Sequence, residues 1–333
     1  MMTSNRTFGI EIEAFGITMQ AARTALRNAG LECEIEGYNH ETRAHWKVVS
    51  DASVPDGFEV VSPVLEGERG LAQAKKALDA LHAAGSRLDR RCGLHAHYGI
   101  SDLTAAEIAT VVRRYAKFED EIDAWMAPSR RGDANRYCRS VKSFLSSGEV
   151  TRKLASGSVR DVCDAFGTRY AKVNLEAWRR HRTIEFRQHG GTVEAEKALA
   201  WIRFGLGFIE ESRRVAHGTN TAALIPANSK MATVMTMLSR MGGATIDDLI
   251  AATGWKRHSL RAAISTQLRK RGLEVVSRRE NGTTVYAIIN RAVDAADHVM
   301  AGIDDETATY LRRRAAQIAR RDPRALRPGD RAA

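Results

Sequence analysis

The sequence predicts an α+β fold with a mostly antiparallel sheet, followed by a separate small domain. Three observations lead to this prediction. In the first part of the chain, strand and helix patterns alternate without an internal repeat. No strand–helix unit there carries a GxGxxG or GxxxxGKS loop, which argues against Rossmann and P-loop folds. In the last third the pattern changes to short helices and a hairpin, which indicates a second domain.

Each element of the first part rests on a local pattern. Apolar residues at every second position predict strands, and a spacing of three or four predicts helices. Gly30 and Gly85 end two helices, Ser101 is placed to cap the longest one, and a Pro-Asp-Gly turn joins two strands. In chain order the prediction is a strand at 8–16, a helix at 19–30, strands at 46–54 and 57–65, a helix at 71–85, a strand at 92–100, a helix at 101–126, a strand at 183–191 and a helix at 193–216.

The last third of the chain predicts a winged helix-turn-helix domain. Helices are expected over 229–240, after the cap residue Thr245, and over 257–272. Two strands joined by an Asn-Gly pair, the strongest short hairpin signal, follow them. Three helices and a hairpin within about 60 residues are typical of this domain. The predicted organisation is a domain at 1–216, a linker at 217–229, the winged helix at 230–290 and a helical tail at 291–333.

The net charge of +11 is unevenly distributed along the chain. Residues 228–333 contain 19 Lys and Arg and 11 Asp and Glu residues, a balance of +8, which leaves +3 for the residues before them. This asymmetry suggests that a nearly neutral body carries an appendage that faces nucleic acid.

Composition and cysteine usage are those expected of a cytoplasmic globular protein. No apolar run approaches the length of a membrane helix, and the N-terminus lacks the apolar core of a signal peptide. The four cysteines are dispersed and form no CxxC pair. We therefore expect reduced thiols, with neither a disulfide framework nor a zinc knuckle.

Three strand segments carry paired polar residues at alternate positions. Alternate residues of a strand point to the same face of a sheet, and apolar residues fill the positions between them. The pairs are Glu11/Glu13, His95/His97 and Glu185/Arg187, and Glu59 stands alone on a fourth strand. Any one pair is equally well explained as a solvated strand face. Together they predict one shared face of carboxylate, imidazole and guanidinium groups.

Paired carboxylates on one sheet face repel, and a divalent cation between them would relieve the repulsion. Mg²⁺ and Mn²⁺ prefer oxygen ligands, and Mn²⁺ also accepts imidazole. Zinc is the competing metal because His95 and His97 could bind it together with carboxylates, but HxH spacing alone is weak evidence. The sequence therefore favours a face that holds two or three magnesium or manganese ions around a triphosphate.

The loop after the longest predicted helix is rich in arginine. It contains Arg130, Arg131, Arg136 and Arg139. Such a loop is usually solvated, but if it folds over the carboxylate face its guanidinium groups would clamp phosphate oxygens. Arg187, beside Glu185, could neutralise a phosphoryl group during its transfer.

Several segments in a fixed order resemble those of the amidoligase family, over about residues 8–215. They are GxExE at Gly9, Glu11 and Glu13, SDASVPDGFEVVSPVLEG, CGLHAHYG, RYAKVNL at 169–175, and TIEFRQHGGT with Trp201 downstream. The family belongs to the carboxylate–amine ligase superfamily, which includes glutamine synthetase and glutamate–cysteine ligase. The resemblance implies a glutamine synthetase-like curved antiparallel sheet with flanking helices, whose active-site face holds ATP and two or three Mg²⁺ ions.

The resemblance also implies a role for each polar residue of the face, carried over by position. Glu13 and Glu59 would hold the ion nearer the carboxylate substrate, and Glu11, His95 and Glu185 the ion between the β- and γ-phosphates. His97 would face substrate or a phosphate, and Arg130, Arg131, Arg136 and Arg187 would contact phosphates and the acyl phosphate. Candidates for a further acidic ligand are Glu66 and Glu68, and candidates for a general base are Glu59 and Asp51.

The implied activity is ATP-dependent ligation of a carboxylate to an amine. ATP would phosphorylate the carboxylate to an acyl phosphate, and an amine would attack it to form an amide or isopeptide bond. The substrates would be an amino acid, peptide or protein; no membrane partner is expected, and an oligomer is compatible with the sequence. Two alternatives remain: a DNA-binding regulator whose ligase-like domain senses a ligand without turnover, and a metal-dependent hydrolase or nuclease that uses the same acids.

The C-terminal domain resembles the DUF3489 family, a small winged-helix domain of unknown function, through GATIDDLIAATGWKRHSLRAAIS and LRKRGLEVVSRRENGTTVYAI. Leu260, Ile264 and Leu268 recur every four residues and are expected to face its core. The residues expected to contact duplex DNA are Lys256, Arg257, Ser259 and Arg261 on the recognition helix and Arg278 and Arg279 on the wing. The alternative is a module that binds protein or presents substrate.

Overall fold

The structure is a computed structural model that describes residues 5–51, 54–223, 229–238, 244–268, 275–280, 282–288, 299–300 and 302–321. The chain divides into two compact units. One consists of Met1–Arg213 with Val299–Ala333, and the other of Arg214–His298. Within the described residues, no helix is both long enough and apolar enough to cross a membrane.

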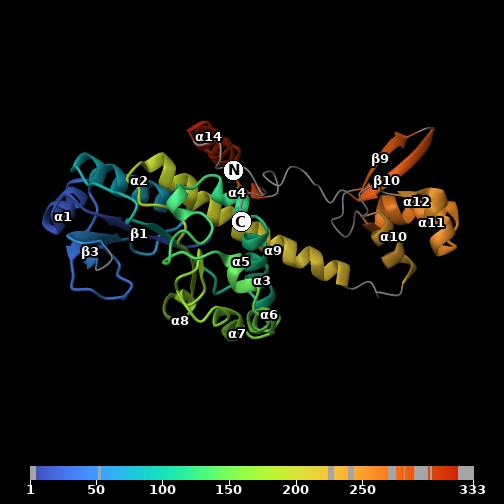
Figure 1. Cartoon of the computed structure of the whole chain (residues 1–333), viewed down its shortest axis with the longest axis horizontal. Helices are drawn as coiled ribbons and strands as arrows, with labels where there is room; N and C mark the ends of the chain where they lie inside the picture. Colours follow the sequence, from blue (N-terminus) through green and yellow to red (C-terminus); the bar gives the residue numbers. More distant parts are fainter. Residues whose placement is uncertain are drawn as a thin grey trace, which may run out of the picture. The chain divides into compact units, whose positions relative to one another are not determined.

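A seven-stranded sheet is the framework of the first unit (Figure 1). In spatial order its strands are β2 (Cys33–Ile35), β3 (Trp46–Asp51), β4 (Gly57–Val61), β1 (Phe8–Ala14), β5 (Leu94–Gly99), β7 (Thr183–Phe186) and β6 (Val173–Asn174). Neighbouring strands are antiparallel, except that β2 runs parallel to β3. The unit therefore has the predicted α+β class, with one parallel pair that makes the sheet mixed.

Helices of very different lengths accompany the sheet. They are α1 (Met19–Asn28), α2 (Gly67–Ala83), α3 (Ala105–Lys117), α4 (Glu119–Asp123), α5 (Val141–Leu145), α6 (Gly148–Leu154), α7 (Val159–Cys163), α8 (Ala177–His181), α9 (Ala195–Ala223) and α14 (Asp305–Arg321). The short elements between α4 and β7 were not predicted, because five-residue helices lack a clear period and depend on their tertiary neighbours.

One face of the sheet is apolar and packs against helices. The side chains of Ile12, Ala96 and Phe186 on this face are fully buried. They belong to a core that also contains residues of α2, α3 and α9. The Phe186 ring lies 5.2 Å from the rings of both Tyr98 and Tyr115, in edge-to-face contacts. Burial of this face stabilises the unit by about 25 cal/mol per Å² of apolar surface removed from water.

The predicted helix over 101–126 is two helices, and its cap is not Ser101. Thr104 caps α3, since its hydroxyl accepts the Glu107 N–H while the Glu107 carboxylate accepts the Thr104 N–H. Ser101 has no such acid three residues later. Phe118 leaves the helical conformation, with φ −104° and ψ 15°, and α4 starts after it. The break lets acids of α4 point inward, as described below.

The boundary between the units also differs from the predicted organisation. Helix α9 continues to Ala223, so the predicted linker at 217–229 begins inside a helix. The tail predicted at 291–333 returns to the first unit through α14, where Ala308 and Leu311 join the main core. The second unit is therefore inserted between two helices of the first. Helix α14 is amphipathic, and its apolar stripe is buried against the core of the first unit.

The second unit has helices beside a hairpin (Figure 1). Its described elements are α10 (Lys230–Leu238), α11 (Ile246–Thr253), α12 (Arg257–Ala262), a π-helical turn η2 (Ala263–Leu268), and the strands β8 (Ala244–Thr245), β10 (Thr283–Ile288) and β9 (Val275–Glu280), in the order β8-β10-β9. Thr245 caps α11 as predicted, and Glu280 pairs with Thr283 across the predicted hairpin. Asn281 lies outside the described residues. The predicted core residues Leu260, Ile264 and Leu268 are buried.

Candidate functional site

The polar face of the seven-stranded sheet brings together acids and histidines from four strands. The strand register pairs Glu11 with His95, Glu13 with Glu59, and His97 with Glu185. Directly paired residues of neighbouring strands point to the same face of a sheet. The six side chains therefore form one continuous surface across β4, β1, β5 and β7, which we call the floor.

Both imidazoles of the floor contact carboxylates. His95 Nδ1 lies 3.1 Å from Glu11 Oε2 and 3.5 Å from Glu185 Oε1, and His95 Nε2 lies 3.6 Å from Glu13 Oε1. His97 Nε2 lies 3.3 Å from Glu11 Oε1 and 3.8 Å from Glu185 Oε1. Both histidines therefore share Glu11 and Glu185, and Glu11 makes the closer contact with each of them.

Neighbouring groups hold the outer carboxylates of the floor in place. Glu13 Oε2 accepts the Gly93 backbone N–H at 2.6 Å. A Cβ atom at position 93 would lie 2.7 Å from His95 Nε2, so any larger residue there would displace this imidazole. Glu185 accepts hydrogen bonds from the Asn174 amide and from the Arg187 guanidinium. Both acids thus keep a defined orientation.

Three carboxylates of the floor have shifted pKa values. Burial works to raise the pKa of Glu11, but the charges and hydrogen bonds of His97 and His95 hold it well below its usual value. Burial likewise opposes ionisation of Glu185, and the Arg187 charge nevertheless lowers its pKa. Glu59 shows the opposite shift. Burial and the charges of Glu11 and Glu13 raise the pKa of Glu59 well above its usual value.

Two overlapping groups on the floor fit a metal ion. Glu11, His97 and Glu185 form one group, and Glu11, Glu59 and His95 form the other. Within each group the donor atoms all lie within 4.8 Å of one another. The donors are carboxylate oxygens with one imidazole per group, a set that suits Mg²⁺ or Mn²⁺. The repulsion that raises the pKa of Glu59 is the repulsion that a divalent cation would relieve.

Glu11 takes a different place from the one carried over by resemblance. It belongs to both groups, whereas the sequence assigned it only to the ion on the nucleotide side. His97, expected to face substrate or phosphate, is a candidate ligand together with Glu11. Glu13 belongs to neither group, although its Oε1 faces His95 at 3.6 Å. Strand register explains why Glu11 reaches both histidines of β5, because it pairs directly with His95 and lies diagonally opposite His97.

The floor opens into a cavity of about 400 Å³ that six arginines help to line. Arg187 and Arg130 lie there as predicted. Arg131 was also predicted to contact phosphates; its guanidinium donates to the Met126 carbonyl at 2.9 and 3.0 Å and does not line the cavity. Arg136 also does not line it, and packs over the Tyr137 ring instead. Loop conformation, which sequence composition does not determine, decides which arginines face the cavity.

Two acids besides those of the floor line this cavity, Asp51 and Glu176, whereas Glu66 and Glu68 do not line it. Asp51 lines the cavity at the end of β3, and its charge contributes to the raised pKa of Glu59. Glu66 and Glu68 are exposed at the start of α2, where Glu68 lies 4.0 Å from Arg203 of α9. The segment between Glu59 and Glu66 leaves the sheet to enter α2, which carries these acids away from the floor.

A buried lysine that the sequence did not single out organises the arginine-rich loop. Lys172 is fully buried, and its Nζ lies 2.7 Å from Glu119 Oε1 and 2.6 Å from Asp123 Oδ1. Glu119 accepts the backbone N–H of Val141 at 2.9 Å, and Asp123 that of Gly132 at 2.7 Å. The two acids thus connect one ammonium group to both ends of the loop.

The contacts around Lys172 extend to two arginines that line the cavity, Arg130 and Arg187. The Gln188 amide donates to Asp123 and, at 3.0 Å, to the Arg130 carbonyl. The Lys172 carbonyl accepts the Arg187 backbone N–H at 2.9 Å. A lysine between apolar residues of a strand segment, with acids at i and i+4 of a distant helix, was the available signal in the sequence.

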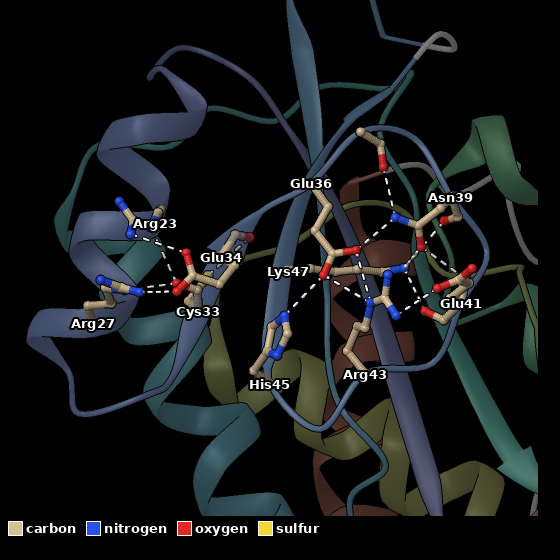
Figure 2. A network of polar contacts seen from close by, with 11 residues as sticks. Arg23, Arg27, Cys33, Glu34, Glu36, Asn39, Glu41, Arg43, His45 and Lys47 are labelled. Atoms are coloured by element: carbon tan, nitrogen blue, oxygen red, sulfur yellow. Dashed lines mark hydrogen bonds and ion pairs between the residues drawn. The ribbon is translucent and has the colours of Figure 1, made fainter.

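A loop held by its own polar network crosses the polar face of the sheet (Figure 2). The Glu36 carboxylate accepts hydrogen bonds from Asn39 at 2.8 Å and Arg43 at 3.1 Å, and His45 Nε2 lies 3.0 Å from it. From the sheet below, Lys47 Nζ donates to Asn39 Oδ1 and to the Glu41 carbonyl, both at 2.7 Å. The loop is therefore fixed to the sheet.

This loop lies between two cavities that share part of the floor. The second cavity, of about 180 Å³, is lined by strand ends, the loop and apolar groups such as Val61 and Pro63. Residues that line both cavities are Glu11, His40, Glu59, His97 and His181. The two spaces thus share these residues of the floor, three of which, Glu11, Glu59 and His97, are candidate metal ligands.

Most residues predicted to contact DNA are accessible on the second unit. Lys256, Arg257 and Arg261 are exposed on or beside α12, and Ser259 is half-buried. Arg278 and Arg279 are exposed on β9. Arg257 forms an ion pair with Asp247 of α11, which leaves it less available than the others. Trp255 packs against the core of this unit, as its sequence position suggested.

Comparison with known families confirms both resemblances. The family described as "Putative amidoligase enzyme" matches residues 4–209, which include every residue of the floor. The chain belongs to this amidoligase family. A second family, described as "Protein of unknown function (DUF3489)", matches residues 225–288 in the second unit. No curated protein sequence matches the chain. Membership in the amidoligase family supports a ligase.

Proposed function

We propose that this amidoligase uses ATP and Mg²⁺ to activate a carboxylate as an acyl phosphate and to join it to an amine. The observation that carries the proposal is the floor, where acids and imidazoles from four strands meet below a cavity lined with arginine. The proposal includes a glutamine synthetase-like curved sheet for the first unit, which the family match and the antiparallel sheet support.

The residues of the floor have distinct tasks in this proposal. Glu11, Glu59, Glu185 and both histidines would hold the cations, with Glu13 beside them. Bound Mg²⁺ would supply charge neutralisation for the phosphates of ATP. Arg187 is placed to stabilise negative charge on the phosphoryl group, because its guanidinium lies against Glu185 and faces the cavity. Arg130 adds a second guanidinium from the loop.

Two bond exchanges complete the proposed reaction. A carboxylate oxygen of the substrate forms a bond to the γ-phosphorus of ATP, while the bond from that phosphorus to the ADP oxygen breaks. The amine nitrogen then forms a bond to the acyl carbon, inorganic phosphate leaves, and the amine loses one proton. Glu59 and Asp51, both at the cavity, are the candidate acceptors for that proton.

The test is release of ADP and phosphate from ATP and Mg²⁺ in the presence of pooled amino acids and peptides. We expect Arg187→Ala and Glu13→Gln each to abolish ADP release while circular dichroism shows an intact fold. Arg131→Ala is the matched control, since it removes a guanidinium that does not line the cavity. Full activity of Glu13→Gln, or equal losses in the two arginine variants, would contradict the assignment.

The exposed basic residues of the second unit favour a second candidate function. In it, the second unit is a winged helix that contacts duplex DNA, and the ligase-like unit senses a ligand without turnover. Arg261 and Arg279 are exposed, and the segment 228–290 has a balance of +6 charges from 10 basic and 4 acidic residues. Tight ATP binding without turnover by any acceptor would favour this candidate over the ligase.

DNA contact is tested on the full chain by the salt dependence of duplex binding. We expect the Arg261→Ala/Arg279→Ala variant to bind more weakly and to reduce the slope of log K against log salt by about 2. Lys75→Ala, which removes an exposed cation from α2 of the first unit, should leave binding unchanged. Binding that is absent or independent of salt would point to a protein partner.

A further inference from the structure

Exposed aromatic and apolar side chains gather at the mouths of the two cavities. Among the described residues, three large hydrophobic side chains are exposed: Tyr38 at 58%, Val64 at 61% and Tyr137 at 38%. Tyr38 and Tyr137 line the larger cavity, and Val64 lines the smaller one. Such groups on an otherwise polar surface commonly mark a binding site.

Two Arg-Tyr dipeptides from distant parts of the chain lie side by side at the larger mouth. The rings of Tyr137 and Tyr170 are 5.6 Å apart in an edge-to-face contact. Arg136 lies 4.7 Å from the centre of the Tyr137 ring, and Arg169 lies 5.3 Å from the centre of the Tyr170 ring. With Tyr38, these four residues form what we call the Arg–Tyr platform.

Backbone and side-chain contacts join the parts of the platform. The Arg139 N–H donates to the Tyr170 carbonyl at 2.8 Å, which aligns the two dipeptides. Tyr38, Arg169 and Tyr170 line the same cavity, and hydrogen bonding to Tyr170 and Tyr38 raises the pKa of the Arg169 guanidinium. Arg187 Nε lies 3.4 Å from the Tyr137 carbonyl. The platform is therefore connected to the floor by Arg187.

The platform carries positive charge that is not balanced locally. Arg136, Arg169 and Arg180 are exposed, and Arg169 and Arg180 line the larger cavity. Within the described parts of the chain, none of these three forms an ion pair with a carboxylate. By contrast, Arg91 and Arg179 of the same cavity pair with Asp89 and Asp164. The unpaired guanidinium groups thus favour an anionic ligand.

We propose that the Arg–Tyr platform binds an acidic segment of a polypeptide, whose reacting carboxylate reaches the floor. This rests on the proposed function and adds the substrate class: a carboxylate presented by a peptide or protein. Tyrosine and arginine are the residues that dominate peptide and protein binding sites, because they give large contact area and strong hydrogen bonds. A free amino acid is too small to cover Tyr38, both dipeptides and the floor together.

A nucleobase is the competing ligand for the aromatic rings, and the geometry favours it less. Each dipeptide's arginine already lies near the ring of its own tyrosine, which leaves less ring surface for stacking. The guanidinium groups remain available at the exposed mouth, where carboxylate side chains of a peptide could reach them. The smaller cavity combines apolar side chains such as Val61 and Val64 with only two Lys or Arg residues, Lys47 and Arg182, so an uncharged ring fits there better than at the platform.

The test is binding of a fluorescent oligo-glutamate peptide to the full chain, measured by anisotropy without ATP or Mg²⁺. We expect binding that weakens with salt, and about tenfold weaker binding by Arg136→Ala/Arg169→Ala. Arg152→Ala, which removes an exposed arginine of α6, should bind like the parent chain. Oligo-glutamine of equal length and free glutamate should compete poorly.

Three outcomes would overturn the proposal. They are equal binding of oligo-glutamine, unchanged peptide binding by the double variant, and competition by free glutamate as strong as by the peptide. Weaker ATP binding by the double variant with unchanged peptide binding would assign the platform to the nucleotide. Because the assay needs no turnover, failure of the ligase proposal is distinguishable: the peptide would bind, but ATP would give no product.

Discussion

The two faces of the first unit's sheet are made by the same strands but do different work. On β5, Ala96 and Tyr98 face the helices, while His95 and His97 face the floor. Burial does not separate the faces, because His95 is 5% exposed and Glu185 only 3%. The two faces differ in what their side chains contact: one face packs against apolar side chains, and on the other, carboxylates and imidazoles contact one another. Adjacent residues of one strand can therefore be assigned to stability or to chemistry.

The largest effects should come from neighbours on β7. Phe186→Ala removes a ring from the apolar face and should lower the free energy of unfolding by about 3–5 kcal/mol. Glu185→Gln on the floor should change it by about 1 kcal/mol or less, yet reduce ligation at least about 1,000-fold. Urea unfolding followed by circular dichroism measures the first quantity, and ADP release the second. Equal destabilisation by both would disprove the separation of the faces.

Lys172 carries a buried charge but lines neither of the two cavities, so we expect its ion pairs to contribute to stability alone. Lys172→Met leaves the Glu119 and Asp123 carboxylates buried without their ammonium, so it should destabilise the unit by about 3 kcal/mol. Lys142→Met is the matched control, since it breaks an exposed ion pair with Asp120 and should cost about 0.5 kcal/mol or less. Denaturant midpoints measure both. Adding Glu119→Gln and Asp123→Asn to Lys172→Met should recover part of the loss; no recovery would place its origin elsewhere.

The pKa values of His97 and His189 are shifted in opposite directions, which allows a test by pH. Burial works against protonation of His97, but Glu185 and Glu11 raise its pKa. Burial, with the Lys197 charge, lowers the pKa of His189 to about 3. Its unfolded pKa is about 6.5, so between these values the unfolded chain binds more protons, and stability from His189 is lost as the pH falls.

That loss should be about 2 kcal/mol between pH 7 and pH 5. The measurement is the free energy of unfolding at both pH values for the parent chain and for His189→Gln, in which the His189 contribution to the difference should disappear. His82→Gln, at an exposed position of α2, should keep the parent's difference. A difference that His189→Gln leaves intact would show that this residue is not protonated on unfolding.

In both units, the amino-acid sequence by itself determined local features: which residues share a face of a strand or helix, and where a helix begins. The alternation in β1 placed Glu11 and Glu13 on one face, and that in β5 did the same for its two histidines. It also determined the Thr245 cap and the buried row that contains Leu260. These features were predictable because side-chain direction in a strand, capping and helix period depend only on neighbouring residues.

The tertiary structure alone decided which of these residues meet. Strand order set β1 between β4 and β5, so that Glu11 joins both candidate metal groups and Glu59 reaches the floor from the other side. The conformation of the arginine-rich loop turned Arg131 back onto the Met126 carbonyl, and contacts between distant segments buried Lys172 between two acids of α4. No local pattern encodes these outcomes, since register, loop conformation and burial depend on packing between segments far apart in the chain.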